Sequence, residues 1–485
     1  MTPSKITFDK KLLLEKKAEK FQDFHNLMSF RIHDIILVSS MYDFYLFEED
    51  GRLYELIRKE YQGLNLSNSP ELVHVSSAKE AIKLARKSSR FNLIITTLHV
   101  EDMSAVKLAQ VVKRLGINIP IALLGYDNNE MIEILKSKEV EVFDKVFMWQ
   151  GDYRIVFGII KYFEDKMNIE SDTKRVGVQI IILIEDSVRF YSSYLPLVYT
   201  EVVKQAQRLS VEGINLSHRF LKMRARPKII LCSNYEEAWK YYKRYENNVL
   251  GVISDVDFKK GGVQNKKACI LFAKRVKKIR PDLPILLQSN VEKNRELAHN
   301  LGASFLYKNS STLLEDLRMF MNEQFSFGDF IFRMPTGEEV WRASNLTELA
   351  EKLAEIPEES IAYHSSRNHF SNWLKSRTDF WLAYQLRPRK INHYRSIDAL
   401  REDLIEAIHN YNRDRQSGVI SDFDSATFNK LSFFARIGGG SIGGKARGLG
   451  FFSSLLSNFD ISNKFSDYKF CFKMWEWSRN FRSIC

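Results

Sequence analysis

Residues 180–186, five aliphatic residues followed directly by Glu185 and Asp186, constrain the fold of this chain more than any other stretch. A continuous apolar run predicts a strand that is buried on both faces, as in the parallel sheet of an α/β protein. Three further apolar runs also end in a polar residue: 249–254 before Asp255, 284–288 before Ser289, and 303–307 before Lys308. Because ligands bind at the carboxyl edge of such sheets, the sequence predicts a site where these polar residues meet.

The residue types at this predicted edge indicate a metal-dependent site. Three carboxylates brought together repel one another unless a cation lies among them, and hard oxygen ligands suit Mg²⁺. Each acid or hydroxyl taken alone is better explained as the N-cap of a following helix, where Asp and Ser are common. Five such positions, filled in order on successive strands, favour the functional interpretation.

This set of residues resembles the receiver domain of two-component response regulators, a flavodoxin-like doubly wound α/β fold. The resemblance implies that Asp255 is a carboxylate nucleophile that accepts a phosphoryl group. It implies further roles for the neighbouring residues: Mg²⁺ held by Glu185, Asp186, Asp255 and the backbone carbonyl of Asp257, and phosphoryl oxygens contacted by Ser289 and Lys308. The implied partner is a histidine kinase or another phosphodonor.

The composition of the chain excludes several functional classes. At 485 residues the length allows about three domains, and 45% hydrophobic with 27% charged residues is ordinary for a globular protein. No run approaches the roughly 18 apolar residues of a membrane span. The charged N-terminus has no apolar signal core, so we expect a cytoplasmic protein without a membrane partner. The Cys residues have no metal or disulfide spacing: Cys232, Cys269, Cys471 and Cys485.

The net charge of +12 raises the question of a nucleic-acid partner. The densest basic cluster, residues 274–280, lies at the end of an amphipathic helix just before Pro281, where cations suit the negative end of the helix dipole. Its charges are interleaved with Val276 and Ile279 at core spacing, and no zinc-finger or helix-turn-helix pattern accompanies it. We interpret the cluster as a solvated helix face and expect no nucleic-acid partner.

The first third of the chain repeats the strand and helix pattern of the receiver without its chemistry. We expect residues 1–30 to be a charged helical leader and residues 31–165 to be a pseudo-receiver. Neutral or bulky residues stand at the five site positions of this copy: Ser39, Ser40, Thr97, Gly125 and Trp149. Hydroxyls compete poorly with water for a hard cation, so we expect no Mg²⁺ there and a role in packing, receiver–receiver contact or homodimer contact.

The polar stretch 164–175 is the best linker candidate, and the competent receiver follows at residues 176–325. This receiver departs from its family between Asp186 and the strand at residues 228–232, where some 40 residues replace a single crossover helix. Residues 199–209 and 216–223 could form two helices or one long helix there. The insertion is a candidate docking surface.

After residue 326 the alternation of strands and helices stops, and residues 326–430 read as a mainly helical connector. A turn-forming Pro-Thr-Gly at residues 335–337 predicts a hairpin. Helices are expected over residues 346–354, 369–386 and 397–411. The histidines of this segment have no ligand spacing, so packed or exposed side chains are favoured over a metal site: His364, His369, His393 and His409.

Residues 438–450 are rich in glycine, so their backbone amides could approach an anion closely. A P-loop is excluded because Ala446 stands where that motif needs Ser or Thr. The stretch resembles instead the start of the ATP-grasp domain of phosphoenolpyruvate synthase and pyruvate phosphate dikinase. The resemblance implies that Gly443 and Gly444 bind nucleotide and that Lys445 contacts ATP phosphates. A flexible glycine linker is the alternative.

Together these features predict the regulatory part of a phosphoenolpyruvate synthase-like phosphotransferase that receives phosphate at Asp255. Residues 431–485 would be a truncated ATP-grasp N-terminus, because no further domain of that enzyme family follows, and the composition of the last 18 residues indicates a frameshift. ATP would be a cofactor only of a complete domain, and we expect this chain to be inactive alone. The alternatives are a stand-alone response regulator acting by protein contact and an ATP-binding kinase subunit.

Overall fold

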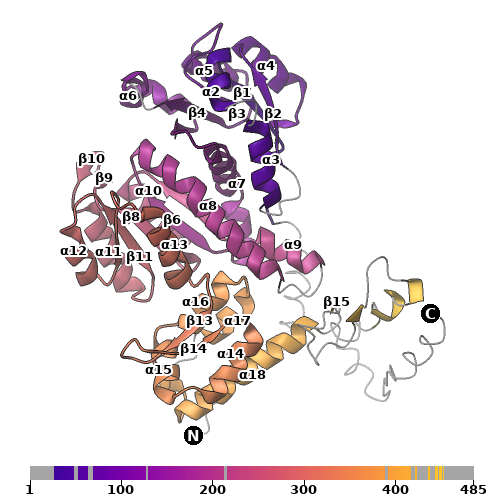
Figure 1. The fold of residues 1–485 in the computed structure, drawn as a ribbon, viewed down its shortest axis with the longest axis vertical. Coiled ribbons are helices and arrows are strands. Elements are labelled where there is room, and N and C mark those ends of the chain that lie inside the picture. Colours follow the sequence, from indigo (N-terminus) through magenta and orange to yellow (C-terminus); the bar gives the residue numbers. More distant parts are fainter. Residues whose placement is uncertain are drawn as a thin grey trace.

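The computed structural model describes residues 27–48, 53–63, 69–126, 129–211, 216–387 and 391–416, with short pieces at 421–422, 435–436, 443–445, 447–450 and 452. The predicted leader lies almost wholly outside these residues, as does the stretch from 453 to 485. The described chain forms two α/β units followed by a smaller module of a two-stranded hairpin and helices (Figure 1).

The first unit is a five-stranded sheet in the order β2-β1-β3-β4-β5, and every neighbouring pair is parallel. Its strands are β1 (Asp34–Val38), β2 (Glu71–Val75), β3 (Phe91–Thr96), β4 (Ile121–Tyr126) and β5 (Lys145–Trp149). This is the strand order of flavodoxin-like folds, in which β2 is added on one side of β1 and the later strands are added on the other.

Helices cover both faces of this sheet. One face packs on helices whose buried residues recur at helical spacing: α4 (Ala78–Lys87), α5 (Ala105–Arg114) and α6 (Asn129–Lys136). The other face packs on α2 (Met41–Glu48), α3 (Leu53–Gly63) and α7 (Arg154–Val176). The start of α5 is fixed by Ser104, whose side chain accepts a hydrogen bond from the backbone N–H of Lys107.

The second unit repeats this topology, with the strand order β12-β11-β8-β6-β7. Its parallel strands are β6 (Ile180–Ile184), β7 (Lys228–Cys232), β8 (Val249–Asp255), β11 (Ile285–Ser289) and β12 (Ser304–Tyr307). Alternate residues of β6 enter different cores: Ile180 and Ile182 face one, Ile181 and Leu183 the other. The predicted α/β class with two flavodoxin-like sheets is therefore confirmed.

The helices of the second unit include the insertion that the sequence left open. It forms two helices, α8 (Val188–Val211) and α9 (Leu216–Arg224), and α8 begins 11 residues earlier than the predicted helix at 199. The remaining helices alternate with the strands: α10 (Tyr235–Arg244), α11 (Ala268–Ile279), α12 (Asn294–Asn300) and α13 (Leu313–Gln324). The long α8 packs on α7, on α9 and on β5 of the first unit.

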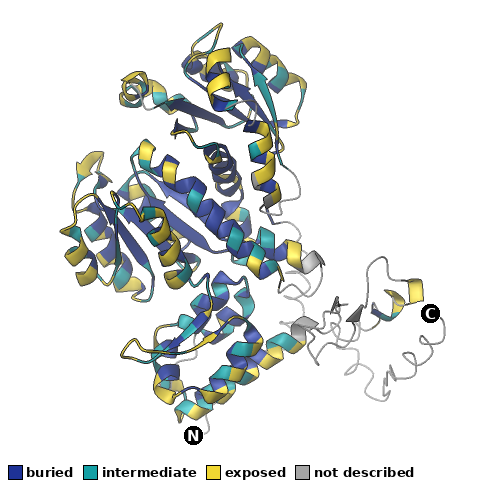
Figure 2. Ribbon diagram, in the orientation of Figure 1, coloured by how far each residue is buried: buried dark blue, intermediate teal, exposed yellow. Residues whose placement is uncertain are grey.

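Helices α7 and α8 lie between the two sheets and join their cores. Residues from both sheets and both helices form one continuous hydrophobic cluster, from Ile35 on β1 through Phe163 on α7 to Ile253 on β8. Figure 2 shows α7 buried almost all round between the units. A helix that is buried on nearly every side has neighbours on nearly every side. Through α7 and α8 the two units therefore share a core.

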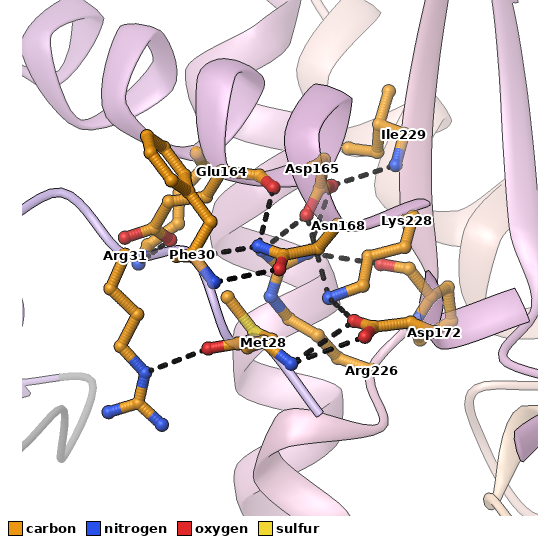
Figure 3. Close-up of polar contacts among 12 residues, drawn as sticks. Met28, Phe30, Arg31, Glu164, Asp165, Asn168, Asp172, Arg226, Lys228 and Ile229 are labelled. Atoms are coloured by element: carbon orange, nitrogen blue, oxygen red, sulfur yellow. Dashed lines mark hydrogen bonds and ion pairs between the residues drawn. The ribbon is translucent and has the colours of Figure 1, made fainter. Parts of the chain in front are cut away.

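The interpretation of residues 164–175 as a linker is wrong, because α7 runs unbroken through them to Gly177, whose φ of +85° ends the helix. One side of this stretch is solvated, with Lys166, Glu170, Lys174 and Arg175 exposed. The other side is buried and its polar groups are paired, among them Glu164, Asp165, Asn168 and Asp172 (Figure 3). Asp165 meets the guanidinium of Arg226 in front of β7, and Asp172 lies 3.1 Å from Lys228 Nζ. These charges hold the end of α7 against the second unit.

The third module is built on the predicted hairpin, with β13 (Phe330–Arg333) antiparallel to β14 (Glu339–Ala343). Five helices pack around it: α14 (Leu346–Glu355), α15 (Glu358–Ser366), α16 (His369–Ser376), α17 (Phe380–Leu386) and α18 (Ile397–Gln416). The single helix predicted over 369–386 is wrong. It is broken at Thr378, whose φ of +65° no helix tolerates.

This module packs against the amino-terminal edge of the second sheet, opposite the predicted site. Lys375 Nζ donates to the carbonyl of Asn247 at 3.0 Å, and Lys222 Nζ donates to the carbonyl of Arg377 at 3.3 Å. Phe380 adds an apolar contact with Val178 and Ala225. None of the helices among the described residues is both long and apolar enough to cross a membrane.

Candidate functional site

The candidate site lies at the carboxyl edge of the second sheet, where the strand order changes direction. Strand β7 lies on one side of β6 and β8 on the other, so the residues after β6 emerge at a topological switch point. The parallel register aligns Ile184 with Ser254, which sets Glu185 beside Asp255. Strands β11 and β12 bring Ser289 and Lys308 to the same edge.

Three carboxylates converge there. Glu185, Asp186 and Asp255 each offer an oxygen, and these oxygens lie within 4.8 Å of one another. Among the described residues this is the one set of three potential ligands so arranged. Lys308 joins the set from β12, with its Nζ 2.7 Å from Glu185 Oε2 and 3.0 Å from Asp255 Oδ2.

Burial raises the pKa of all three acids in this cluster. Burial raises the pKa of Glu185 to about 7, with Asp255 adding to the rise and Lys308 opposing it. Burial also raises the pKa of Asp255 and of Asp186, again against the charge of Lys308 or of Lys259. Two of the three acids, Glu185 and Asp255, thus share one buried lysine. Their oxygens are the hard donors that Mg²⁺ prefers, so the residues present fit a divalent cation.

Asp257 contributes differently from the other acids. Its backbone carbonyl accepts a hydrogen bond from Gln264 Nε2 at 2.8 Å. Its carboxylate oxygen Oδ1 is buried and has no hydrogen-bond partner among the described residues. The predicted carbonyl ligand is therefore close to the acid cluster, and in this structure it is engaged by an amide.

The amide of Gln264 belongs to a short hairpin that was not predicted from the sequence. Strands β9 (Phe258–Lys260) and β10 (Val263–Asn265) pair antiparallel directly after Asp255, around Gly261 and Gly262. Both glycines have positive φ, +63° at Gly261 and +79° at Gly262, as a two-residue type I′ hairpin turn requires. The Gly-Gly pair at 261–262 is the sequence feature that could have predicted this hairpin turn.

Ser289 ends β11 with its hydroxyl fixed. Its Oγ accepts hydrogen bonds from the backbone N–H of Val291 at 3.1 Å and from Asn294 Nδ2 at 2.8 Å. A hydroxyl has two lone pairs and one O–H, so the O–H is what remains to donate to a ligand. This arrangement suits an anion with exposed oxygens.

Aromatic side chains from α8 cover the site lysine. Lys308 Nζ lies 4.2 Å from the centre of the Phe190 ring, a distance at which a cation is attracted to the ring face. The hydroxyl of Tyr194 is buried nearby, and burial raises its pKa, with Glu185 and Asp255 adding to the rise. No sequence motif predicts Phe190 or Tyr194 at the site. Both are there because α8 begins shortly after Asp186 and carries them past the sheet edge.

The corresponding edge of the first sheet is built differently. Ser39 Oγ lies 3.1 Å from His74 Nε2, and Thr97 Oγ1 donates to the carbonyl of His99 at 3.1 Å. At position 125 a Cβ would lie 2.0 Å from Met131 Cε, so the thioether fills the place of a site hydroxyl. Trp149 stacks edge-on against Phe47, 4.7 Å between ring centres. Ser40 starts the turn into α2, its Oγ accepting from the backbone N–H of Asp43.

A cleft of about 550 Å³ lies beside the site, between the two units. The first unit contributes Lys145 and Met148 of β5, and the second contributes Asp186, Arg189 and Lys259. Burial lowers the pKa of Lys145 to about 8, and its Nζ lies 4.7 Å from the centre of the Tyr191 ring. The cleft gives solvent a route to Asp186.

The predicted nucleotide residues lie far along the chain from this site. Gly443, Gly444 and Lys445 are exposed, and no atom of the described residues lies within 4 Å of a Cβ placed on either glycine. Most of the surrounding residues lie outside the described part of the chain. The structure therefore brings together the residues predicted for the acid site. The predicted nucleotide-binding role of the glycine-rich stretch stays a prediction.

Residues 322–432 match a protein family described as a family of unknown function (DUF5752). The match covers the C-terminal module and neither sheet. No curated protein matches the chain. Two solved structures, each titled as a two-component system response regulator/GGDEF domain protein, align at 12% identity over 61% of this chain and 98% of theirs, with TM-scores of 0.27 and 0.25. Those scores add nothing to the topology described above.

Proposed function

We propose that residues 176–325 are a phosphoryl-accepting receiver and that Asp255 is the acceptor. The observation that carries the proposal is the convergence of Glu185, Asp186 and Asp255 around Lys308 at the switch point of a parallel sheet. A structural ion pair would need one acid per lysine. Three acids in one partly buried cluster leave negative charge that a divalent cation would neutralise.

The proposed step is a phosphoryl transfer with the carboxylate as nucleophile. An oxygen of Asp255 forms a bond to phosphorus while the bond from phosphorus to the donor's leaving group breaks. The leaving group departs with the bonding electron pair, as acetate from acetyl phosphate or as a neutral imidazole nitrogen from a phosphohistidine partner. The product is an acyl phosphate on Asp255.

Residues of this chain then hold the transferred group. The Nζ of Lys308, 3.0 Å from Asp255 in the free site, moves its charge toward a phosphoryl oxygen, and the O–H of Ser289 donates to another. Glu185 and Asp186, with Asp255 and the carbonyl of Asp257, would hold Mg²⁺. When bound, the ion supplies positive charge that shields the phosphoryl oxygens from the attacking carboxylate.

The wider role we propose is regulatory and cytoplasmic. The first receiver, whose edge carries Ser39, Ser40 and Thr97 in place of acids, serves packing. The C-terminal module transmits the state of Asp255. The parent protein would be a phosphoenolpyruvate synthase-like phosphotransferase, on the resemblance at Gly443, Gly444 and Lys445 alone. A stand-alone response regulator is the second candidate, because the acid cluster is formed by residues 185–308 without any part of the glycine-rich stretch.

The proposal is tested on the full chain with acetyl phosphate and Mg²⁺, followed by intact-mass measurement. One phosphate adduct is expected, lost in Asp255→Asn and on chelation of the metal, and retained in Asp152→Asn, a change at a half-buried acid of the first unit. An adduct of undiminished yield in Asp255→Asn would assign the acceptor to another residue and overturn the proposal.

A further inference from the structure

The hairpin β9–β10 is held over the acid cluster by a buried anchor and a loop contact. Phe258, fully buried, fixes its first strand in the core of the second unit. At its tip the backbone N–H of Gly261 donates to Glu236 Oε1 at 3.1 Å. The side chains of Val263 and Gln264 are exposed, so the outer strand carries little packing of its own.

Gln264 reaches from this outer strand into the cluster. Its Nε2 donates to the carbonyl of Asp257 at 2.8 Å, and its amide also lowers the pKa of Asp186 against the effect of burial. A primary amide carries two N–H donors, which suits one carbonyl and one carboxylate. The charge of Lys259, on the inner strand, acts on Asp186 as well. The hairpin therefore presents an N–H donor and a cation to the same acid.

A donor and a metal ion compete for an oxygen in the same position. Asp186 is one of the three carboxylates whose oxygens lie within 4.8 Å of one another. A cation bound among them would also draw on the carbonyl oxygen of Asp257, to which Gln264 is hydrogen-bonded, and it would meet the positive charge of Lys259. Gln264 and Lys259 thus stabilise the charged form of Asp186, as a bound divalent ion would.

From this geometry we propose that Gln264 is a latch that competes with Mg²⁺ for the carbonyl of Asp257, beside Asp186, and thereby sets the metal affinity of the site. The inference rests on the proposed receiver function and adds to it a control of the same site. Mg²⁺ binding requires only that the Gln264 side chain rotate away, because Phe258 keeps the hairpin anchored. Removing the latch leaves the acids in place and frees them for the metal.

The size of the effect follows from the bonds that must break. A hydrogen bond made by an exposed neutral side chain changes an equilibrium by about 2- to 10-fold. The Mg²⁺ dissociation constant of Gln264→Ala is therefore expected to be about 3- to 10-fold lower than that of the unmodified chain. Lys259→Gln is expected to lower it too, by an amount that shrinks as salt is added, because that contribution is electrostatic.

The experiment is calorimetric titration of the full chain with Mg²⁺ in a buffer without other divalent cations. Val263→Ala, a change on the same strand at an exposed side chain that does not touch the cluster, is the matched control and should leave the dissociation constant unchanged. An unchanged constant in Gln264→Ala would overturn the latch. A raised constant would also overturn it, because Gln264 would then be helping to hold the metal.

The acetyl phosphate assay on the same samples separates this inference from the proposed function. If the unmodified chain binds Mg²⁺ and forms the Asp255 adduct while Gln264→Ala binds no more tightly, the latch alone fails. If neither protein binds Mg²⁺ and neither forms the adduct, the receiver function fails and the latch fails with it. Tighter binding in Gln264→Ala, with the adduct intact, supports both.

Discussion

Asp165 and Arg226 form a two-point ion pair between the two α/β units. The guanidinium Nη2 lies 2.8 Å from Oδ1 of the carboxylate, and Nη1 lies 3.1 Å from Oδ2 (Figure 3). Both side chains are buried, and Oδ2 also accepts the backbone N–H of Ile229 at 2.9 Å. One carboxylate on α7 thus fixes both the arginine and the start of β7.

Arg226→Ala is expected to lower the free energy of unfolding by about 3–5 kcal/mol, since it leaves the Asp165 carboxylate buried without its partner. Chemical denaturation followed by far-UV circular dichroism measures the change. Lys174→Ala removes an exposed pair with Glu170 and should cost about 1 kcal/mol or less. Equal losses in the two variants would contradict the assignment of Asp165 and Arg226 as a structural clamp.

A fragment that ends at residue 165 should fail to fold. The cut removes the end of α7, including Asn168, whose side chain bonds both the N–H and the carbonyl of Phe30. It also exposes the face of α7 that shares a core with α8. Dye binding to exposed apolar surface and loss of helical signal are expected, whereas a fragment of residues 27–325 should unfold in one transition. A folded 27–165 fragment would show that the units have separate cores.

Lys308→Ala should make stability depend on divalent cations. Without the lysine, Glu185 and Asp255 face each other with no positive charge, and the loss is on the order of 3 kcal/mol in chelating buffer. Mg²⁺ should recover part of it, because the cation takes over the neutralisation. Thermal unfolding with and without Mg²⁺ measures this. A loss that Mg²⁺ leaves untouched would argue against a metal site.

The C-terminal module should lose stability in mild acid through two paired histidines. Burial lowers the pKa of His364 to about 3 and that of His369 to about 4, and mutual repulsion adds to the shift of His364. Their Nδ1 atoms are 2.9 Å apart, and His364 Nε2 accepts the backbone N–H of Arg333, so both rings are neutral in the folded chain.

The sign follows from proton binding. Unfolded histidines take up protons near pH 6.5, and the folded pair takes them up only near pH 3–4, so stability is complete above about pH 6.5 and falls as the pH drops toward 4. Denaturation curves between pH 7 and pH 4 test this. His369→Phe should flatten the dependence, whereas His409→Gln, at an exposed position, should not. An equal slope in all three proteins would contradict it.

The strands and the site were predictable from sequence because both are local patterns. An apolar run such as residues 180–184 has few alternatives to a buried strand, and the residue that ends it is carried to the sheet edge by geometry alone. The positions of Asp255, Ser289 and Lys308 follow in the same way. Their proposed chemistry stays a prediction.

The linker failed as a prediction because burial of charge depends on partners far along the chain. Asp165 and Asp172 look solvated in sequence, and what buries them are Arg226 and Lys228, more than 50 residues away. Gln264 was missed for a related reason: nothing in its neighbours shows that a hairpin will point its amide at Asp186. The break at Thr378 reflects packing of α16 and α17 rather than a helix-breaking residue.

The methyl group of Met131 fills the space beside Gly125, at the end of the strand where the second sheet carries Ser289. A Cβ at position 125 would lie 2.0 Å from Met131 Cε, so a side chain there must displace the end of that flexible thioether. Trp149 packs against Phe47 at the next strand end, and a lysine in its place would lose that contact. Installing the acid, hydroxyl and lysine set at this edge therefore requires its packing neighbours to rearrange as well, so the five substitutions alone are not expected to reproduce the geometry of the second sheet.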